Sequence, residues 1–363
     1  MKILTFVFFI GLSKYGVESK KKFDILNTGR YLKLSEQYEF LKEISELAED
    51  TVQLEVIGNT YIEGKDYQND IYLVTIGNNS DYVVFFDCGN HAREWISSAV
   101  CLYLIQELAS VFENADEHSE NVMLNYQWQF IPVLNPDGYH LSHVKDRMQR
   151  KNGRPVSSMN LTQEQNDACR CDVHPDECSG VDLNRNFPGG FGKGNQRFVR
   201  ESNLPCFEMY RGAHALSEPE TLALDKHISS LDDKVLAAIS IHSYGKEIYY
   251  PQGWLPDDHK NQIKGENKTL LTDFADAFNE KLKFVVGNAA KLLGEEELEG
   301  GGSDDYYYMT KNINLTYTIE LDPHVDDYAT SFELSPTEIP DVGAKVWNAI
   351  KLMAEKLEEL YPQ

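Results

Sequence analysis

The sequence predicts a single α/β domain in which a mixed central sheet carries helices on both faces. Two observations favour this fold class. Segments with apolar residues at helical spacing alternate with short apolar, β-branched runs along most of the 363-residue chain. Neither an internal repeat nor a linker interrupts this alternation, so we assign to one domain a length that would also allow two small ones.

The individual elements follow from local patterns. A capping box at 217–220, with proline in the first turn, predicts the start of a helix. The stretch 145–203 is polar and rich in glycine and cysteine, which predicts loops held by disulfides. The predicted helices are 35–48, 96–108, 217–231, one that contains 270–278 and one that follows Pro340; the predicted strands are 54–57, 71–76, 82–86, 128–134, 235–241 and 315–321.

The chain is strongly acidic, with a formal net charge of −24 at pH 7. Such a surface argues against nucleic acids and anionic membranes as partners, because both repel negative charge. It could attract cationic peptides, or it could serve only to keep the protein in solution.

The amino terminus predicts export. Residues 1–19 contain a basic residue and then a short apolar run, as in a secretory signal peptide with cleavage after Ser19. The apolar run is shorter than the roughly 20 residues that span a bilayer. We therefore expect residues 20–363 to form the mature domain, secreted to the extracellular space.

Candidate chemistry lies just after an apolar strand, in the string DCGNHAREW at 87–95. The strand-to-helix turn carries His91 and Glu94, and ligand sites in α/β sheets lie at such strand ends. An imidazole and a carboxylate three residues apart can bind one tetrahedral metal ion. Alone, such a pair more often lies in a solvated turn, so the prediction of a metal site depends on the surrounding string.

Five strings resemble, in order, the signatures of zinc metallocarboxypeptidases of the pancreatic carboxypeptidase A and B type. They are the string at 87–95, NPDGY at 135–139, DLNRNF at 182–187, SIHSY at 240–244 and TIEL at 318–321. The resemblance is greatest to carboxypeptidase B. It implies a sheet of about eight strands and a hydrolase that removes C-terminal residues from peptides or proteins. It also implies that no pro-segment separates the signal peptide from the enzyme, and a monomer is expected.

The resemblance assigns a role to each residue of the reaction centre. It implies one Zn²⁺ bound by His91, Glu94 and His242. Asp182 matches the carboxylate that holds the first zinc histidine. Glu320 matches the general base, and Arg150 matches the arginine that stabilises the oxyanion.

A second set of residues matches positions that bind the substrate. An exopeptidase must recognise a free carboxylate, which a guanidinium can bind with two hydrogen bonds. Asp304 matches the pocket residue that selects C-terminal Lys or Arg, although an acidic surface loop is the alternative. The full substrate-binding set implied by the resemblance is Arg93, Asn184, Arg185, Ser243, Tyr244 and Asp304.

Two departures from the family pattern matter. Where the family has a mobile tyrosine that covers the substrate carboxylate, this sequence has Glu297 or Leu298. With the acidic run before Gly300, this leaves open a catalytically weak relative that binds peptide tails, although Tyr306, Tyr307 or Tyr308 could substitute. A carboxypeptidase A-like preference for apolar residues is the alternative to a basic-specific pocket at Asp304. Proline after Asp322 lowers the cost of a cis bond that the family has there, so we predict cis bonds at 322–323 and at 243–244.

The six cysteines agree with export. The resemblance implies a Cys88–Cys101 disulfide and a Cys178–Cys206 disulfide. Cys169 and Cys171 could then bond to each other, or could cross-pair with Cys178 and Cys206, and a second zinc site at these cysteines is a further alternative. Sequons that permit glycosylation occur at Asn78, Asn160, Asn267 and Asn314.

Overall fold

The computed structural model describes residues 29–60, 68–77, 80–115, 121–323 and 328–362. The predicted signal peptide and the sequon at Asn78 lie outside these ranges. The described chain forms one mixed eight-stranded sheet in the order β1-β2-β4-β3-β5-β8-β6-β7. The predicted fold class is therefore confirmed. The strands are β1 (Val52–Asn59), β2 (Asp70–Ile76), β3 (Val83–Cys88), β4 (Gln127–Ile131), β5 (Val235–Ser243), β6 (Glu247–Tyr250), β7 (Val285–Asn288) and β8 (Leu315–Leu321).

Four neighbouring strands in the middle of the sheet run parallel: β4, β3, β5 and β8. The strands on either side, β2 and β6, run antiparallel to them. Parallel strands end at the same edge of a sheet, so this arrangement gathers the residues that follow three central strands. The two four-residue strands, β6 and β7, were not predicted from the sequence.

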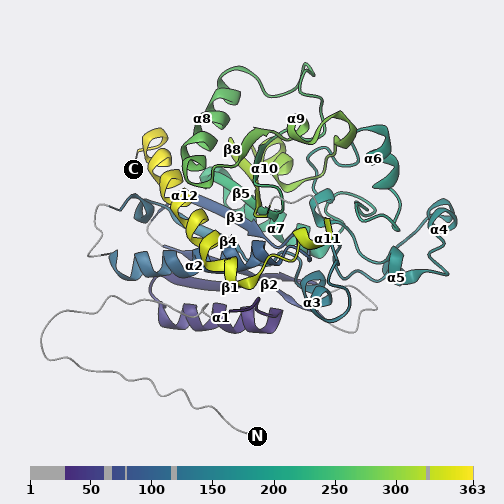
Figure 1. Ribbon diagram of the computed structural model, residues 1–363, viewed down its shortest axis with the longest axis horizontal. Helices are drawn as coiled ribbons and strands as arrows, with labels where there is room; N and C mark the ends of the chain where they lie inside the picture. Colours follow the sequence, from purple (N-terminus) through teal and green to yellow (C-terminus); the bar gives the residue numbers. More distant parts are fainter. Residues whose placement is uncertain (1–28, 61–67, 78–79, 116–120, 324–327, 363) are drawn as a thin grey trace, which may run out of the picture.

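Helices cover both faces of the sheet (Figure 1). Side chains from α1, α2, α8 and α12 belong to one core cluster, and side chains from α7 and α10 belong to the other. The helices are α1 (Leu34–Leu47), α2 (Trp95–Glu113), α3 (Pro136–Val144), α4 (Gln163–Cys169), α5 (Pro175–Cys178), α6 (Gln196–Glu201), α7 (Pro219–Ser230), α8 (Gly265–Leu282), α9 (Ala289–Leu293), α10 (Ser303–Lys311), α11 (Tyr328–Ser331) and α12 (Ile339–Leu360).

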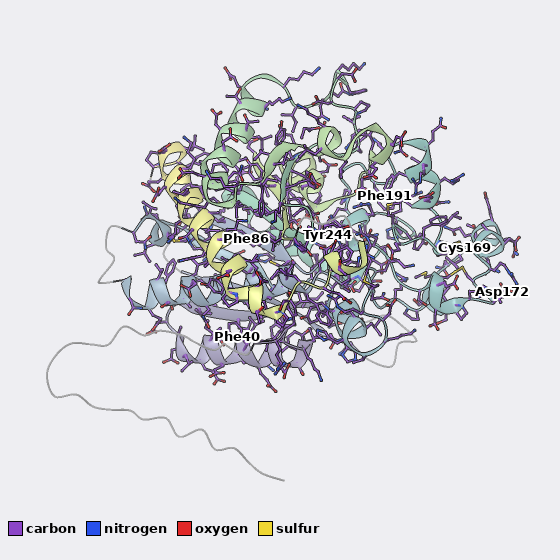
Figure 2. All side chains as sticks on the ribbon, in the orientation of Figure 1. Phe40, Phe86, Cys169, Asp172, Phe191 and Tyr244 are labelled. Atoms are coloured by element: carbon purple, nitrogen blue, oxygen red, sulfur yellow. A yellow bond between two sulfur atoms is a disulfide. The ribbon has the colours of Figure 1, made fainter. Side chains whose placement is uncertain are left out.

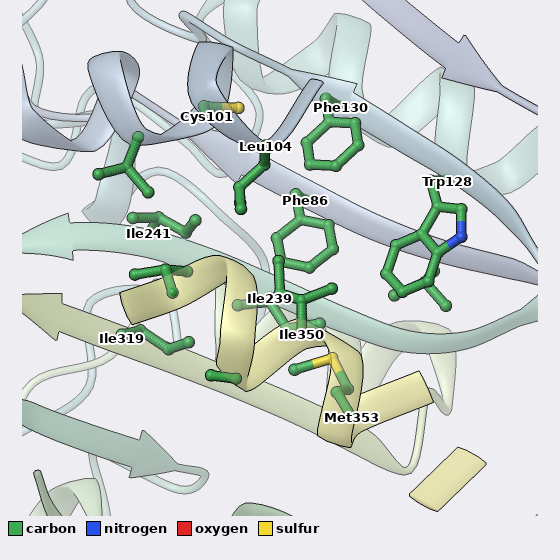
Figure 3. Close-up of a cluster of buried hydrophobic side chains, with 14 of the residues drawn as sticks. Phe86, Cys101, Leu104, Trp128, Phe130, Ile239, Ile241, Ile319, Ile350 and Met353 are labelled. Atoms are coloured by element: carbon green, nitrogen blue, oxygen red, sulfur yellow. The ribbon is translucent and has the colours of Figure 1, made fainter. Parts of the chain in front are cut away.

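Strand β3 shows why the central strands read as continuous apolar runs. Val84 and Phe86 face one core cluster, while Val83 and Phe85 face the other, because side chains alternate along a strand. Figure 3 shows Phe86 among the rings of β4 and the aliphatic side chains of β5, α2 and α12. A strand buried on both faces needs apolar residues at every position.

The predicted helices and strands are present, with two corrections. The helix at 217–231 begins at Pro219, and Glu218 occupies its N-cap without a side-chain cap, so the capping box does not form. The hydroxyl of Ser217 instead donates to Glu218 Oε1 at 2.8 Å. The stretch 145–203 was predicted as loops but contains the short helices α4, α5 and α6.

One helix in the described ranges, α2, is long and apolar enough to cross a membrane by length and composition. It packs between the sheet and α12, and most of it is buried. We therefore describe it as the central helix of the core.

The disulfides differ from those implied by the resemblance. Bonds join Cys169 to Cys206 and Cys171 to Cys178, so the predicted Cys178–Cys206 pair is wrong and the cross-paired alternative is right. This cluster lies in the lobe of α4 and α5, where Figure 2 labels Cys169. Since its sulfurs are in disulfides, they offer no thiolates for a second zinc.

Cys88 and Cys101 carry free thiols in this structure, contrary to the predicted bond. Both are fully buried, Cys88 at the end of β3 and Cys101 on α2, and their thiols lie in hydrogen-bonding contact. Burial and this neighbour raise the pKa of the Cys88 thiol well above its usual value, so it stays protonated.

Candidate active site

The candidate site lies where β3, β5 and β8 end. His91 and Glu94 occupy the turn between β3 and α2, His242 is the penultimate residue of β5, and Glu320 is the penultimate residue of β8. His242 and Glu320 are direct partners in the register of these parallel strands. Three segments distant in sequence thus meet at one edge of the sheet.

The turn that carries His91 is fixed by its glycine and by the 135–139 string. Gly89 has φ +63°, and a Cβ there would lie 2.6 Å from Ser98 Oγ. Asn135 donates from its amide to Asn90 O at 3.0 Å and accepts from Gly138 N at 2.9 Å, which caps α3. One asparagine therefore connects the turn to the helix that follows β4.

Three side chains converge within metal-binding distance. His91 Nδ1 lies 2.7 Å from Glu94 Oε1, His242 Nδ1 lies 3.0 Å from Glu94 Oε2, and the two Nδ1 atoms are 3.2 Å apart. Donor atoms in a tetrahedral zinc site lie about 3.4 Å from one another. A small outward shift of these side chains would therefore accommodate the ion. All three residues are buried.

The Nε2 atoms of both imidazoles, which face away from the other donor atoms, have partners that support a metal site. His91 Nε2 lies 3.2 Å from Asp182 Oδ1, and His242 Nε2 lies 3.0 Å from Ser240 Oγ. If each Nε2 carries the proton, each Nδ1 presents its lone pair to the interior of the site. Two such nitrogens facing each other cannot form a hydrogen bond, whereas both can bind one cation.

The electrostatics of the site also favour a cation. Burial raises the pKa of Glu94, but the imidazoles of His91 and His242 hold that pKa well below its usual range. Burial and repulsion by Glu94 raise the pKa of Glu320 to about 8. Burial lowers the pKa of His242, yet Glu94, Glu320 and Asp87 raise it to about 9. Negative charge is thus in excess around the three donor atoms, and a divalent ion would offset it.

Arg150 is tied to the same centre through Asp182. Its Nε donates to Asp182 Oδ2 at 2.9 Å, and its backbone oxygen accepts from Ala92 N at 3.1 Å. Asp182 is fully buried and bridges His91 and Arg150. Burial raises the pKa of Asp182, but Arg150 and His91 hold it well below its usual value, so the bridge stays charged.

A cleft of about 360 Å³ opens beside these side chains. It brings together nearly all the site residues predicted from the sequence; among the predicted set, only Asp182 and His242 lie behind its wall. The walls also contain residues not predicted to be functional. The lining residues are His91, Arg93, Glu94, Arg150, Asn184, Arg185, Ser243, Tyr244, Tyr249, Gly253, Ala289, Leu293, Glu297, Glu299, Gly302, Asp304, Asp305, Thr318, Glu320 and Phe332.

The predicted substrate arginines both lie in the cleft wall, and both contact carboxylates. Arg93 donates to the two oxygens of Glu208 at 3.0 and 3.1 Å. Arg185 donates to Asn184 O at 2.8 Å and pairs through Nη2 with Glu299. The Arg185–Glu299 pair was not predicted. The sequence shows an acidic run before Gly300, but no local pattern indicates that one of its carboxylates contacts Arg185.

Two adjacent buried carboxyls, Asp304 and Asp305, line the cleft. Asp305 accepts hydrogen bonds from Gly253 N at 3.2 and 3.3 Å. Burial raises the pKa of Asp304, and burial with repulsion by Asp304 raises the pKa of Asp305 well above its usual value. A cationic group in the cleft would stabilise both.

The predicted cis bonds are confirmed at Ser243–Tyr244 and Asp322–Pro323, and a third occurs at Pro251–Gln252. Ser243 N donates to Glu94 Oε2 at 3.2 Å. The ring of Tyr244 packs edge-on against Phe332, with centroids 5.1 Å apart. Ser243 therefore adjoins the three converging side chains, and Tyr244 lies in the cleft wall, near the centre of the molecule in Figure 2.

None of Tyr306, Tyr307 and Tyr308, the tyrosines considered as substitutes for the one that the family has over the substrate carboxylate, lines the cleft. Tyr306 donates to Asp225 Oδ1 at 2.7 Å and Tyr307 donates to Asp87 Oδ2 at 2.8 Å, both away from the cleft. Of Glu297 and Leu298, the two residues expected at the tyrosine position, Glu297 lines the cleft.

Comparisons with known proteins agree with this geometry. The zinc carboxypeptidase family (peptidase M14) matches residues 37–349. Zinc carboxypeptidase A 1 of Drosophila melanogaster is 28% identical over 92% of this chain and 71% of its own length, and carboxypeptidase B of Rattus norvegicus is 30% identical over 85% and 67%. Bovine thrombin-activatable fibrinolysis inhibitor, solved in complex with tick carboxypeptidase inhibitor, superposes with a TM-score of 0.71 and 25% identity, over 92% of this chain and 99% of that one.

Family, fold and site geometry lead to one assignment. The match covers most of the chain, and the same segments supply the converging imidazoles and carboxylates at the strand ends. The chain belongs to the M14 family of zinc carboxypeptidases and is a metallocarboxypeptidase.

Proposed function

We propose that this protein is an exported enzyme that binds one zinc ion and releases C-terminal Lys or Arg from peptides. The observation that carries the proposal is that three converging metal-ligand side chains lie at one cleft beside a buried carboxylate and a buried arginine. The trio is His91, Glu94 and His242. The carboxylate is Glu320 and the arginine is Arg185.

Zinc bound by the trio would polarise the scissile carbonyl and make water a better nucleophile near neutral pH. Glu320 is the base we assign to this water. Its Oε2 has no hydrogen-bond partner among the described residues, although the atom is buried. It is thus free to take a proton from the water and to return it to the leaving amine.

Arg150 is the group we assign to the developing negative charge on the carbonyl oxygen. Asp182 holds its Nε, and the guanidinium lines the cleft with Glu320 and Glu94. A guanidinium that is already oriented stabilises such charge without reorganising.

Arg185 is the residue we assign to the substrate carboxylate, with Asn184 beside it. The Nε of Arg185 is buried and has no hydrogen-bond partner among the described residues. Asn184 Oδ1 accepts from Ser303 N at 2.9 Å, which fixes the amide plane. Arg93, Ser243 and Tyr244 line the same cleft and would contact the preceding residues of the peptide.

Preference for basic residues is supported by the lining of the cleft. Asp304 and Asp305 are both buried there, and the positive charges that act on them come from Arg185 and, for Asp304, also from His242. A lysine or arginine side chain would offset this negative charge, while an apolar side chain would leave it uncompensated.

A catalytically weak, peptide-binding relative is the second candidate. One specific observation favours it: the arginine that should bind the substrate is paired with Glu299 in the free protein. The first candidate, an active enzyme in which Glu299 competes with the substrate carboxylate, gives a role to all of the proposed catalytic residues.

Export is supported by the apolar amino-terminal run in the sequence and by two disulfides, which persist outside the cytosol. Asn160, Asn267 and Asn314 are exposed, so glycosylation at these sequons is sterically possible.

The test is a release assay on matched peptides that end in Arg, Lys, Phe or Leu. We expect release of Arg and Lys to be fastest, loss of activity with a chelator and recovery with stoichiometric Zn²⁺. Faster release of Phe would reject the basic preference. Binding without turnover on any of these peptides, in protein shown to contain zinc, would favour the weak relative.

A further inference from the structure

Glu299 lies on a segment whose backbone is fixed on both sides. Its amide donates to Gly253 O at 3.3 Å, and it forms a β-bridge with Gly194. Next to it, Leu298 O accepts from Asn195 N at 3.0 Å. The position of its Cα is therefore set by the fold, not by the charge on its side chain.

The same segment packs directly on the backbone of Arg185. Gly301 has φ +91°, and a Cβ there would lie 2.3 Å from Arg185 O. Phe187 N donates to Gly301 O at 3.0 Å. This close approach delivers the Glu299 carboxylate to Nη2 of Arg185. The Glu299 side chain is 23% exposed in the cleft, whereas that of Arg185 is 8% exposed.

A substrate carboxylate and Glu299 need the same guanidinium. Arg185 Nη1 donates to Asn184 O and Nη2 is held by Glu299, so only Nε lacks a partner among the described residues. A carboxylate binds an arginine best through two parallel N–H groups. Both two-bond faces of the guanidinium, Nε with Nη2 and Nη1 with Nη2, include Nη2, so a peptide carboxylate competes with Glu299 for that nitrogen.

The displaced carboxylate must find another cation or remain uncompensated. In the cleft it would join Asp304 and Asp305, which already repel each other, and Glu297. A peptide with a neutral last residue adds one more negative charge to this group. A peptide that ends in Lys or Arg adds a positive charge along with its carboxylate.

The geometry points to Glu299 as a specificity-determining residue: it occupies Arg185 in the free protein and transfers to the cationic side chain of a C-terminal Lys or Arg. This inference rests on the proposed preference for basic residues. It adds selection against neutral residues, because they displace Glu299 without offering it a partner. It also explains how a carboxylate can stand beside Arg185, the arginine that we assign to the substrate carboxylate.

The test compares E299Q with the matched control E296Q. Glutamine keeps the size of the side chain and removes its charge. Glu296 is exposed and lies three residues away; it lines the adjoining hollow but forms no ion pair with Arg185, so it tests the loss of a nearby charge without the loss of that contact. Each variant and the wild type are assayed on tripeptides that differ only in a C-terminal Arg or Phe. Inhibition by free L-arginine and L-phenylalanine gives a binding measurement independent of turnover.

We expect E299Q to lower KM for the Phe peptide roughly 10-fold, with kcat little changed, because one charge-assisted hydrogen bond no longer competes. L-phenylalanine should inhibit more strongly by a similar factor. For the Arg peptide, the gain at Arg185 is offset by the lost contact to the side chain, so the Arg-to-Phe ratio falls. E296Q should leave this ratio unchanged.

Three outcomes would overturn the inference. They are an unchanged ratio in E299Q, an equal loss on both peptides with a lowered thermal midpoint, and an equal shift in E296Q. If E299Q does not fold, E299A removes the same contact and is judged by the same ratio. Wild-type preference for Phe would instead overturn the proposed function, so the two failures are distinguishable.

Discussion

Replacing Glu320 with Gln separates the chemistry of the site from its architecture. The substitution keeps the size of the side chain at the end of β8 and removes its ability to take a proton. General acid–base catalysis contributes roughly 10²- to 10⁴-fold, so kcat should fall by at least that much. The three proposed zinc-binding residues are unchanged, and zinc content should stay at the wild-type level.

The same substitution should stabilise the metal-free protein. Folding raises the pKa of Glu320 from 4.5 to about 8 because the carboxylate is buried near Glu94. The unfolded chain loses this proton near pH 4.5 and the folded chain keeps it, so stability falls as pH rises from 4.5 to 8. At pH 7 this penalty is at most about 3 kcal/mol. Glutamine does not ionise, so the E320Q protein does not carry this stability penalty.

The assay is urea unfolding of wild-type and E320Q protein after removal of zinc, at pH 5 and pH 7, beside turnover and zinc content of the metal-loaded forms. The stability difference should grow with pH and should shrink when zinc is bound, because a nearby cation favours the ionised carboxylate. Turnover within tenfold of wild type would refute the base assignment. A pH-independent stability difference would refute the account of the buried carboxylate.

Two further changes test the supports of the site. D182N removes the charge that orients His91 and Arg150, so zinc affinity should fall about 10- to 100-fold in a chelator competition, and an unchanged affinity would contradict the proposed link. Replacing both Cys169 and Cys206 by Ser opens a loop with a separation of 37 residues, against 7 for Cys171 and Cys178. Urea unfolding should show losses of about 4 and about 2 kcal/mol respectively, and the reverse order would contradict the loop-entropy argument.

The sequence predicted the elements whose pattern is local and repeated. Strand β3 and helix α2 bury apolar residues over many consecutive positions, and the strand-end residues His91, His242 and Glu320 follow from such strands and from the family strings. The four-residue strands β6 and β7 were missed because a run that short differs little from a buried loop. Their pairing is set by β8, on which β6 docks.

Long-range pairings were the features that the sequence left open. The spacing of Cys169, Cys171, Cys178 and Cys206 allowed several connectivities, and the folded lobe selected one of them. Glu299 reads as part of an acidic run, and only the approach of the glycine segment to Arg185 shows that it belongs to the cleft. Both depend on contacts between segments distant in sequence, for which local patterns carry no signal.

The three cleft arginines differ in how firmly their partners are held. Arg150 pairs with Asp182, which is fully buried, so this contact cannot be exchanged for a contact with solvent or substrate. Glu208, the partner of Arg93, is 56% exposed, and Glu299, the partner of Arg185, is 23% exposed. Exposed ion pairs contribute little and break at low cost, while breaking a buried pair is expensive. The arginine assigned to the reaction centre is therefore firmly held. Glu208 can be displaced at low cost, whereas Glu299, partly buried against a buried arginine, yields only to a carboxylate that replaces its contact.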